Sequence, residues 1–397
     1  MPLTKAFIPY GAYWSTPFCR WQGSLAGVSA LKLLGDVAPK ALKARGIAPD
    51  VFDGLVLGWT VPQKHFFYGA PWVAGMIGAP GIAGQMVAQA CATSARALCN
   101  AALEVETGLK ACLLAVCCDR TSNGPHLYYP NPAGPGGMGE AENPVWDNFG
   151  FDPWGKTAMV QTAEAVAKKT GITRAQQDEI TVLRYQQYAD SLADDRAFQK
   201  RYVFPVELQK SRTETLTVAE DEGIFPTTAE GLARLKPVSE GGTVTFGSQT
   251  HPADGNAGMV VCTEERARTL SRDPKVNVRL VAFGDARVEK GCMPMATVPA
   301  ARLALERAGI GPRDLRVAKT HNPFALNDVY FCRELGLAPE AVNNNGSPLV
   351  YGHPQAPVGI RIVAEMIEEL QMRGGGYGLF SGCAAGDTSM AVVVKVG

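Results

Sequence analysis

One stretch of sequence occurs twice in this chain, and a repeat of this size constrains the fold more than any composition value. Residues 41–58 read ALKARGIAPDVFDGLVLG, and residues 304–321 read ALERAGIGPRDLRVAKTH. Each copy gives an apolar helical face that ends at a Gly, then Ile, a small residue and Pro, and then an acidic turn before a short apolar strand. The Gly suits the left-handed conformation that closes many helices. Each copy therefore predicts the same helix, turn and buried strand.

The likeness between the two copies continues downstream. Residues 85–119 and 341–387 each predict a strand or loop, a helix, a Gly turn and a buried strand. Strands that alternate with helices are typical of layered α/β folds. In the shared register, Cys91 and His353 take the same place in their halves, each just before its helix. Two halves packed about a pseudo-twofold axis would therefore bring these two side chains together.

Residues 120–249 interrupt the repeat with a segment of different composition. It is first rich in Pro, Gly and aromatic residues and then helical, with Thr173 as the predicted N-cap of a helix. Long insertions of this kind often bind substrate. We therefore expect an N-terminal half over 1–119 and 250–272, an inserted loop or lid domain over 120–249, and a C-terminal half over 273–397.

Composition excludes several classes of function. The 397 residues carry 38 Lys and Arg against 38 Asp and Glu, without a long run of either sign, so a nucleic-acid interface is not expected. No apolar stretch approaches the roughly 18 residues of a membrane span, and the N-terminus does not resemble an export signal. The prediction is a cytoplasmic protein whose ten cysteines are reduced thiols.

Four short segments carry the histidines and cysteines that favour chemistry: QACATSA, THNPFALND, YGHPQAPVG and FSGCAAGDTS. Taken alone, Cys91 before a helix or His353 in a turn is more often structural than catalytic. Together they favour catalysis, because a helix N-terminus and an imidazole both stabilise the thiolate that attacks a carbonyl. The small residues of ACAT and CAAG leave backbone N–H groups open to an oxyanion, and His321 offers a further donor.

These segments resemble the motifs of the thiolase family of acyl-CoA acyltransferases, and the likeness covers almost the whole chain. ACATSA stands at the family's nucleophile loop, NNNGSPLVYGHPQAPVGIRI resembles its Asn-rich Gly-His-Pro segment, and GLFSGCAAGD resembles its C-terminal Cys and Gly segment. TTAEGLARLKPVSEGGTVTFGSQTHPADGNAGMVV follows the family's connection from the loop domain back to the core. The resemblance implies a duplicated α/β/α/β/α layered fold with an inserted loop domain, assembled as a homodimer or a dimer of dimers.

The resemblance also implies roles for individual residues. Cys91 would be the nucleophile that accepts the acyl group, His353 the base that activates it, and Cys383 the acid or base at the methyl carbon of acetyl-CoA. His321 stands at the family's Asn in NEAF, where it would hold the thioester oxygen directly or through water. The backbone N–H groups of Cys91 and Ala385 would form a second oxyanion hole.

Several positions near the acyl group differ from the family pattern. HNPF replaces NEAF, so Asn322 stands where the family has a Glu, and we expect Asn322 and Phe324 of this segment beside the substrate. CAAGD replaces CxGGG, and the His that many thiolases carry ahead of TAE is absent from AMVQTAE. Thr250 falls where the family has a Ser near the pantetheine arm. These differences make simple acetoacetyl-CoA the less expected substrate.

The loop segment between 126 and 154 carries six aromatic residues: Tyr128, Tyr129, Trp146, Phe149, Phe151 and Trp154. Either they pack the loop domain onto the core, or they line a wide aromatic acyl pocket. In the second case Trp154 would contact the acyl group, and Lys156 or Arg120 would pair with a carboxylate on it. In these differences the chain resembles thiolases that cleave benzoylsuccinyl-CoA, which implies a small partner subunit with zinc-ribbon and OB-type folds.

The predicted function is thiolysis of a 3-oxoacyl-CoA, or the reverse Claisen condensation, through an acyl group on Cys91. Coenzyme A would be a substrate, and no metal, flavin or nucleotide cofactor is expected, because neither a GxGxxG after a strand nor a Walker-type loop occurs. Two alternatives stay open. A ketoacyl-synthase type of condensing enzyme would use Cys91, His321 and His353, and an inactive homologue would bind acyl-CoA without reaction.

Overall fold

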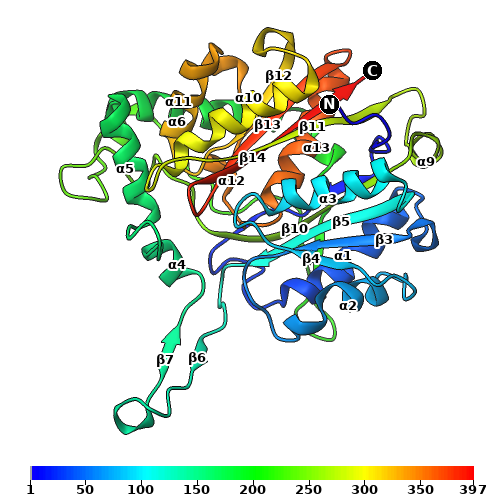
Figure 1. Ribbon diagram of the computed structural model, residues 1–397, viewed down its shortest axis with the longest axis horizontal. Helices are drawn as coiled ribbons and strands as arrows, with labels where there is room; N and C mark the ends of the chain where they lie inside the picture. Colours follow the sequence, from blue (N-terminus) through cyan, green and yellow to red (C-terminus); the bar gives the residue numbers. More distant parts are fainter. Residues whose placement is uncertain (1) are drawn as a thin grey trace.

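Two mixed β-sheets form the frame of the molecule, and the computed structural model describes residues 2–397 (Figure 1). The strands of the first sheet lie in the order β1 (Tyr13–Ser15), β10 (Ala253–Cys262), β5 (Cys112–Arg120), β3 (Gly54–Gly58) and β4 (Gln85–Val87), and β2 (Cys19–Arg20) also pairs with β10. The strands of the second sheet lie in the order β11 (Val278–Arg287), β14 (Thr388–Val396), β13 (Gly376–Ala384) and β12 (Leu315–His321).

The two sheets repeat one topology. The strands β3 and β5 pair in parallel, as do β12 and β13. Each parallel pair continues through an antiparallel strand, β10 or β14, to an antiparallel outer strand, β1 or β11. The order β1-β10-β5-β3 therefore matches β11-β14-β13-β12. β4 has no full counterpart among the described strands, because its place in the second sheet holds only a parallel bridge between Ala318 and Val342.

Helices lie in three layers around the two sheets (Figure 1). The middle layer consists of α3 (Thr93–Thr107) and α13 (Val358–Met372), which pack on each other between the sheets. The outer face of the first sheet carries α1 (Ala30–Ala44) and α2 (Gly69–Met76). The second sheet carries α10 (Thr297–Ala308), with α11 (Ala325–Leu335) beside it. The architecture is the predicted α/β/α/β/α arrangement.

Both copies of the repeated sequence form the predicted helix, turn and strand. Gly46 with φ 69° follows α1, and Gly309 with φ 70° caps α10, so both glycines adopt the left-handed conformation that the pattern requires. A single 3-10 turn, 49–51 in one copy and 312–314 in the other, then leads into β3 or β12.

The central helix α13 is buried from Val358 to Leu370 although four of these residues are charged. Each of the four charges lies in an ion pair. Arg361 donates to both carboxylate oxygens of Asp221 at 2.6 and 2.7 Å, and Glu368 accepts from Arg201 at 2.6 Å. Because an unpaired buried charge is strongly destabilising, these partners fix where α13 lies and therefore where its N-terminus points.

The segment between β5 and β10 contains the elements β6 (Leu127–Tyr129), β7 (Glu140–Glu142), α4 (Trp146–Gly150), α5 (Met159–Thr170), α6 (Arg174–Asp190), α7 (Ala193–Arg196), β8 (Val206–Gln209), β9 (Thr215–Val218) and α8 (Ala229–Ala233). The β6–β7 hairpin extends away from the body of the molecule (Figure 1). Thr173 caps α6 as predicted, since its hydroxyl oxygen accepts from the Gln176 N–H at 3.3 Å. A fully buried ion pair, Arg184 with Asp328 at 2.7 Å, ties α6 to α11.

Two short helices complete the fold: α9 (Glu264–Leu270) follows β10, and α12 (Pro348–Tyr351) precedes the loop that leads to α13. Within residues 2–397, none of the helices combines the length and the apolar character needed to cross a bilayer.

Candidate active site

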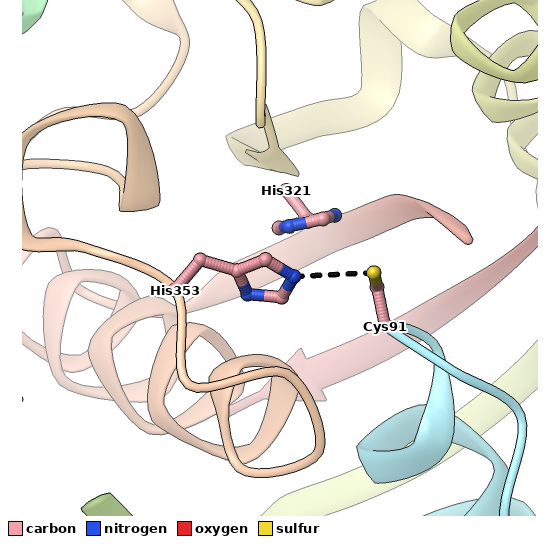
Figure 2. A group of neighbouring side chains, drawn as sticks. All are labelled: Cys91, His321 and His353. Carbon is pink, nitrogen blue, oxygen red and sulfur yellow. Dashed lines mark hydrogen bonds between the residues drawn. The ribbon is translucent and has the colours of Figure 1, made fainter. Parts of the chain in front are cut away.

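The two residues that the repeat predicted to meet do lie together (Figure 2). Cys91 lies just before α3, His353 lies in the loop before α13, and the His353 Nε2 atom is 3.1 Å from the Cys91 Sγ atom. The Ser94 hydroxyl at the start of α3 donates to the carbonyl of Ala356 at the start of α13. The N-termini of the two central helices are therefore joined next to the site.

The loop that carries Cys91 is strained and tightly held. Ala90 has a φ of 43°, a left-handed conformation that is unfavourable for a residue with a Cβ. Thr93 stabilises it, because its hydroxyl accepts from the Gln89 N–H at 2.8 Å and donates to the Ala90 carbonyl at 2.7 Å. The sharp turn presents the Cys91 side chain at the floor of a cavity.

The environment of Cys91 keeps its thiol protonated at neutral pH. Burial raises the pKa of Cys91 to about 12, although hydrogen bonds from the backbone N–H groups of Ala385 and of Cys91 itself lower it. These two N–H groups, which the sequence assigned to an oxyanion hole, are directed at the sulfur, and their role toward a substrate oxygen stays a prediction. A thiol with this pKa needs a base beside it before it can attack a carbonyl.

His353 is neutral in this environment. Burial, followed by the proximity of His321, lowers the pKa of His353 well below 6.5. The Gln355 N–H approaches His353 Nδ1 at 3.3 Å, a long contact that orients the ring with Nε2 toward Cys91. Because Nδ1 accepts in this contact, the ring proton lies on Nε2, and His353 takes up the proton of Cys91 at Nε2 only after its own proton has moved to Nδ1.

His321, the last residue of β12, contacts His353 in a tilted arrangement, with ring centroids 4.3 Å apart and the ring planes at 47°. Its Nδ1 atom lies 3.1 Å from the carbonyl oxygen of Cys383, and because a carbonyl only accepts, Nδ1 carries the proton. The Nε2 lone pair is then free, and this atom is buried without a hydrogen-bond partner. Burial lowers the pKa of His321 to about 4. This tautomer can accept from a bound water, but it does not offer the direct donation to a thioester oxygen that the sequence suggested.

Cys383 lies near the end of β13 and is fully buried. Its Sγ atom accepts from the Asn327 side-chain amide at 3.4 Å and lies 3.9 Å from His321 Nδ1. Burial, reinforced by the neighbouring Cys91, raises the pKa of the Cys383 thiol. Ala385 lines the cavity, whereas Cys383 is not one of its lining residues. The expected acid and base role of Cys383 stays a prediction.

The cavity above Cys91 has a volume of about 810 Å³ and is mainly apolar. Two expected substrate residues, Thr250 and Phe324, line it, and the Thr250 hydroxyl donates to the Pro348 carbonyl at 2.5 Å. Its aromatic lining consists of Tyr129, Trp146, Phe149, Phe246 and Phe324. Three of the six aromatic residues predicted for an acyl pocket therefore reach it, and Tyr128, Phe151 and Trp154 do not.

Other residues proposed for the substrate lie elsewhere. The Asn322 amide is buried against Asp328 at 2.7 Å and Ser347 at 3.1 Å, so it does not line the cavity. Trp154 is 64% exposed, because the turn at Asp152, which accepts from the N–H of Trp154 at 2.7 Å, directs it outward. Two basic residues that were also proposed to contact the substrate have partners away from the cavity.

Those two cations are Lys156 and Arg120. The Lys156 ammonium lies over the ring of Phe151 at 5.4 Å, and the Arg120 guanidinium donates to the carbonyl oxygens of Val28 at 3.0 Å and Asn123 at 2.9 Å. Neither lines the cavity above Cys91. In the present geometry neither is placed to pair with a carboxylate on a bound acyl group.

Sequence reasoning missed Asp119, the buried carboxylate near the end of β5. Its oxygens accept from the N–H groups of Thr60, Val61 and Ala356, each at 2.9 Å, and from the Thr60 hydroxyl at 2.7 Å. Burial raises the pKa of Asp119 to about 7. Asp119 thereby joins the first half to the loop that carries His353. The available signal was an acidic residue at the end of an otherwise apolar strand.

A second cavity of about 410 Å³ adjoins the first. The two share a wall that includes Trp146, Phe246 and His251. Arg20 lines the second cavity, and of the lysines and arginines that the structure describes, it is the one that reaches either space. A basic group thus lies beside the catalytic cavity at a position that sequence reasoning did not select.

Comparison with known proteins agrees with this geometry. The family profiles described as the thiolase N-terminal domain and the thiolase C-terminal domain match residues 12–265 and 274–396. The acetyl-CoA acetyltransferase of Paracoccus denitrificans is 29% identical over 99% of this chain and 100% of its own length. The beta-ketothiolase BktB of Cupriavidus necator is 32% identical over 94% and 95%.

Solved structures show the same likeness. The human mitochondrial 3-ketoacyl-CoA thiolase in complex with CoA superposes with a TM-score of 0.90 and 26% identity, over 100% of this chain and 99% of that one. The molecule therefore has an acyltransferase fold, in which a cysteine and a histidine are paired at the N-termini of two central helices. The chain belongs to the thiolase family.

Proposed function

We propose that this chain catalyses CoA-dependent thiolysis of a 3-oxoacyl-CoA, and the reverse Claisen condensation, through a thioester on Cys91. The observation that carries the proposal is the 3.1 Å contact between His353 Nε2 and Cys91 Sγ, with the N–H groups of Cys91 and Ala385 directed at the same sulfur. In our proposal Cys91 is the nucleophile, His353 is the base, and the two N–H groups that are directed at the sulfur would hold the oxyanion when substrate is bound.

The first half-reaction begins when His353, with its ring proton moved from Nε2 to Nδ1, takes the proton of Cys91 at Nε2. The thiolate attacks the C3 carbonyl carbon, and the bond between C2 and C3 then breaks, so that its electron pair remains on C2 as the enolate of an acyl-CoA. In our proposal Cys383 protonates C2 and becomes a thiolate. The acyl group stays on Cys91, and the shortened acyl-CoA leaves.

The second half-reaction restores every proton. A molecule of CoA gives its thiol proton to the Cys383 thiolate, and the CoA sulfur attacks the thioester carbonyl. The Cys91 sulfur leaves as a thiolate and recovers its proton from the protonated His353. CoA is thus a substrate, and in our proposal Thr250, on the cavity wall, lies along its pantetheine arm.

We further propose a bulky acyl group, with an aromatic acyl chain such as that of benzoylsuccinyl-CoA as the case to test. The names of the relatives refer to acetyl-CoA and 3-ketoacyl-CoA. The support for a larger substrate is the 810 Å³ cavity with its five aromatic side chains. Arg20 in the adjoining cavity would pair with a carboxylate that such a substrate carries.

Two experiments test this function. Mass spectrometry of the protein after incubation with acyl-CoA should find one acyl group on Cys91, and no adduct across a broad panel would favour an inactive acyl-CoA-binding homologue. Steady-state kinetics with several 3-oxoacyl-CoAs should then rank aryl above acetyl substrates. Rapid cleavage of acetoacetyl-CoA with no cleavage of aryl substrates would contradict the bulky acyl pocket but not the thiolase reaction.

The cluster of Cys91, His321 and His353 also fits the condensing chemistry of a ketoacyl synthase, since that class uses one cysteine with two histidines. The two functions differ in their need for Cys383. If Cys383→Ala retains full thiolytic turnover, the two-thiol mechanism proposed above is wrong. If it retains only acylation of Cys91, the two-thiol mechanism stands.

The assembly belongs to the same proposal. We expect a homodimer or a dimer of dimers, and with benzoylsuccinyl-CoA as substrate a small zinc-ribbon and OB-type partner subunit. Light scattering of the purified chain measures the first. Activity toward the aromatic substrate by the chain without any added subunit would count against the second.

A further inference from the structure

Three potential metal ligands lie together (Figure 2), and two of them, Cys91 and His353, line the cavity. The Cys91 sulfur and one nitrogen from each of His321 and His353 all lie within 4.8 Å of one another. The three come from different parts of the chain: the loop before α3, the end of β12 and the loop before α13. A thiolate and two imidazoles form the set of soft and borderline donors that binds Zn²⁺ in proteins.

His321 is already arranged as a metal-binding histidine. Such a histidine typically donates its other ring N–H to a carbonyl or carboxylate, which fixes the tautomer and directs the remaining lone pair at the metal. His321 Nδ1 meets the Cys383 carbonyl at 3.1 Å, and His321 Nε2 is buried without any hydrogen-bond partner. The side chain is fully buried, so this orphaned lone pair is a second observation that points to a ligand.

A tetrahedral Zn²⁺ ion would require only small movements. Zn–N bonds of about 2.0 Å and Zn–S bonds of about 2.3 Å place the ligand atoms roughly 3.3–3.6 Å apart. The contact between Cys91 and His353 is already 3.1 Å, and the widest separation in the group is at most 4.8 Å. Binding through His353 Nε2 would move that ring's proton to Nδ1 and give up the 3.3 Å contact with the Gln355 N–H.

We propose that Cys91, His321 and His353 form a binding site for Zn²⁺ that excludes thiolysis while it is occupied. The ion takes the Cys91 sulfur as a thiolate and releases its proton, and the fourth position opens toward the cavity, where a water completes the tetrahedron. A metal-bound sulfur no longer attacks the C3 carbonyl carbon of the substrate. The site would thus protect the nucleophile and regulate it by zinc. The regulatory role rests on the proposed function, whereas the metal site itself stands or falls separately from the proposed reaction.

Titration of the full-length, EDTA-treated chain with Co²⁺ tests the site, because a cobalt ion bound to a thiolate gives an intense near-ultraviolet charge-transfer band. We expect one equivalent of Co²⁺ to saturate the band and Zn²⁺ to displace it. Cys91→Ser should abolish the band. His321→Asn should weaken Zn²⁺ binding by about 100-fold or more, because removal of a ligand costs more than the roughly tenfold to 100-fold lost when an outer-shell partner of a ligand is removed.

His126→Gln is the matched control, because it removes an exposed histidine outside the cluster. It should leave the Zn²⁺ affinity unchanged. The absence of a saturable band in the wild-type chain would overturn the proposal, and so would equal Zn²⁺ affinities in His321→Asn and His126→Gln. Circular dichroism of each variant shows that it is folded, and alkylation of Cys91 with iodoacetamide gives a second readout, since bound Zn²⁺ should slow it.

Discussion

The loops before α3 and α13 have equivalent places in the two halves, yet they carry different chemistry. The first presents Cys91 from a strained turn with Ala90 at a φ of 43°. The second presents His353 and follows Gly352, which has a φ of 89°. The supporting helices differ as well, because α13 is buried from Val358 to Leu370 whereas α3 has an exposed face. Duplication supplied one scaffold twice, and the two copies then took complementary halves of one site.

Loss of the nucleophile should break this pairing with the largest effect. Cys91→Ala should lower kcat for thiolysis by about 10⁴-fold or more, because no acyl group can form on the protein. Cys99→Ala is the control, since Cys99 lies on α3 but packs in the core. It should cost some stability and leave the acyl adduct on Cys91 intact. Substantial thiolysis by Cys91→Ala would show that Cys91 is not the nucleophile.

The histidine of the second sheet should leave a signature in the pH dependence of stability. His321 has a pKa of about 4 in the folded protein and about 6.5 when unfolded, so the unfolded chain binds more protons at acid pH. The free energy of unfolding should therefore fall by about 3 kcal/mol from this group as pH drops from 6.5 to 4, and it should be constant above 6.5.

Chemical denaturation of the wild type and His321→Asn between pH 4 and 7.5 measures this contribution. The comparison is needed because Asp119, whose pKa is raised to about 7, acts in the opposite direction. Its contribution to the free energy of unfolding falls as pH rises from about 4 to 7. Subtracting the two pH profiles cancels Asp119, and the difference reports His321 together with its effect on the pKa of the neighbouring His353. Parallel profiles would contradict a neutral, buried His321.

The carboxylate that joins the two halves should matter for both stability and rate. In Asp119→Asn one side-chain oxygen becomes an N–H group that faces the N–H of Ala356, which leaves that buried donor without an acceptor. We expect a loss of about 2 kcal/mol in the free energy of unfolding and a lower kcat, because this loop carries His353.

Asp53→Asn provides the matched control for Asp119. Asp53 also accepts backbone N–H groups, those of Ala111 at 2.8 Å and Cys112 at 3.0 Å, but it holds a turn that leads into β5 rather than the loop of His353. It should reduce stability and leave kcat unchanged. If Asp119→Asn reduces stability alone, Asp119 does not position His353.

The smallest effect should come from the aromatic residue that the structure leaves outside the cavity. Trp154→Ala should change the free energy of unfolding by within about 0.5 kcal/mol and leave kcat/KM unchanged, since Trp154 is 64% exposed. Phe246→Ala removes an aromatic side chain from the cavity wall, so it should raise KM for a bulky substrate. Equal losses of kcat/KM in both variants would indicate that Trp154 does line the acyl pocket.

Residues that the register of the repeat or a local pattern places could be predicted from sequence, whereas side chains that tertiary packing directs, including Asp119 inside the repeat, could not. The register of the two copies brought Cys91 to His353 and placed Gly309 at a helix end, because local patterns fix both. Asn322 lies in the second half, but its amide turned toward Asp328 through tertiary packing that no local pattern encodes. The direction of the side chain of Trp154 depends on a single Asp turn in the unrepeated segment, where no second copy constrains the interpretation.

The placement of α3 and α13 against each other also has a consequence for folding kinetics. Each half leaves the inner face of its own central helix uncovered until the other half arrives, and the sulfur and imidazole that meet at 3.1 Å are 262 positions apart in the chain. Contacts of such long sequence separation are slow to form, because the closure entropy of the intervening chain opposes them. We therefore expect the reactive centre to form late in folding, so a partly folded chain would expose its cysteine without the histidine that activates it.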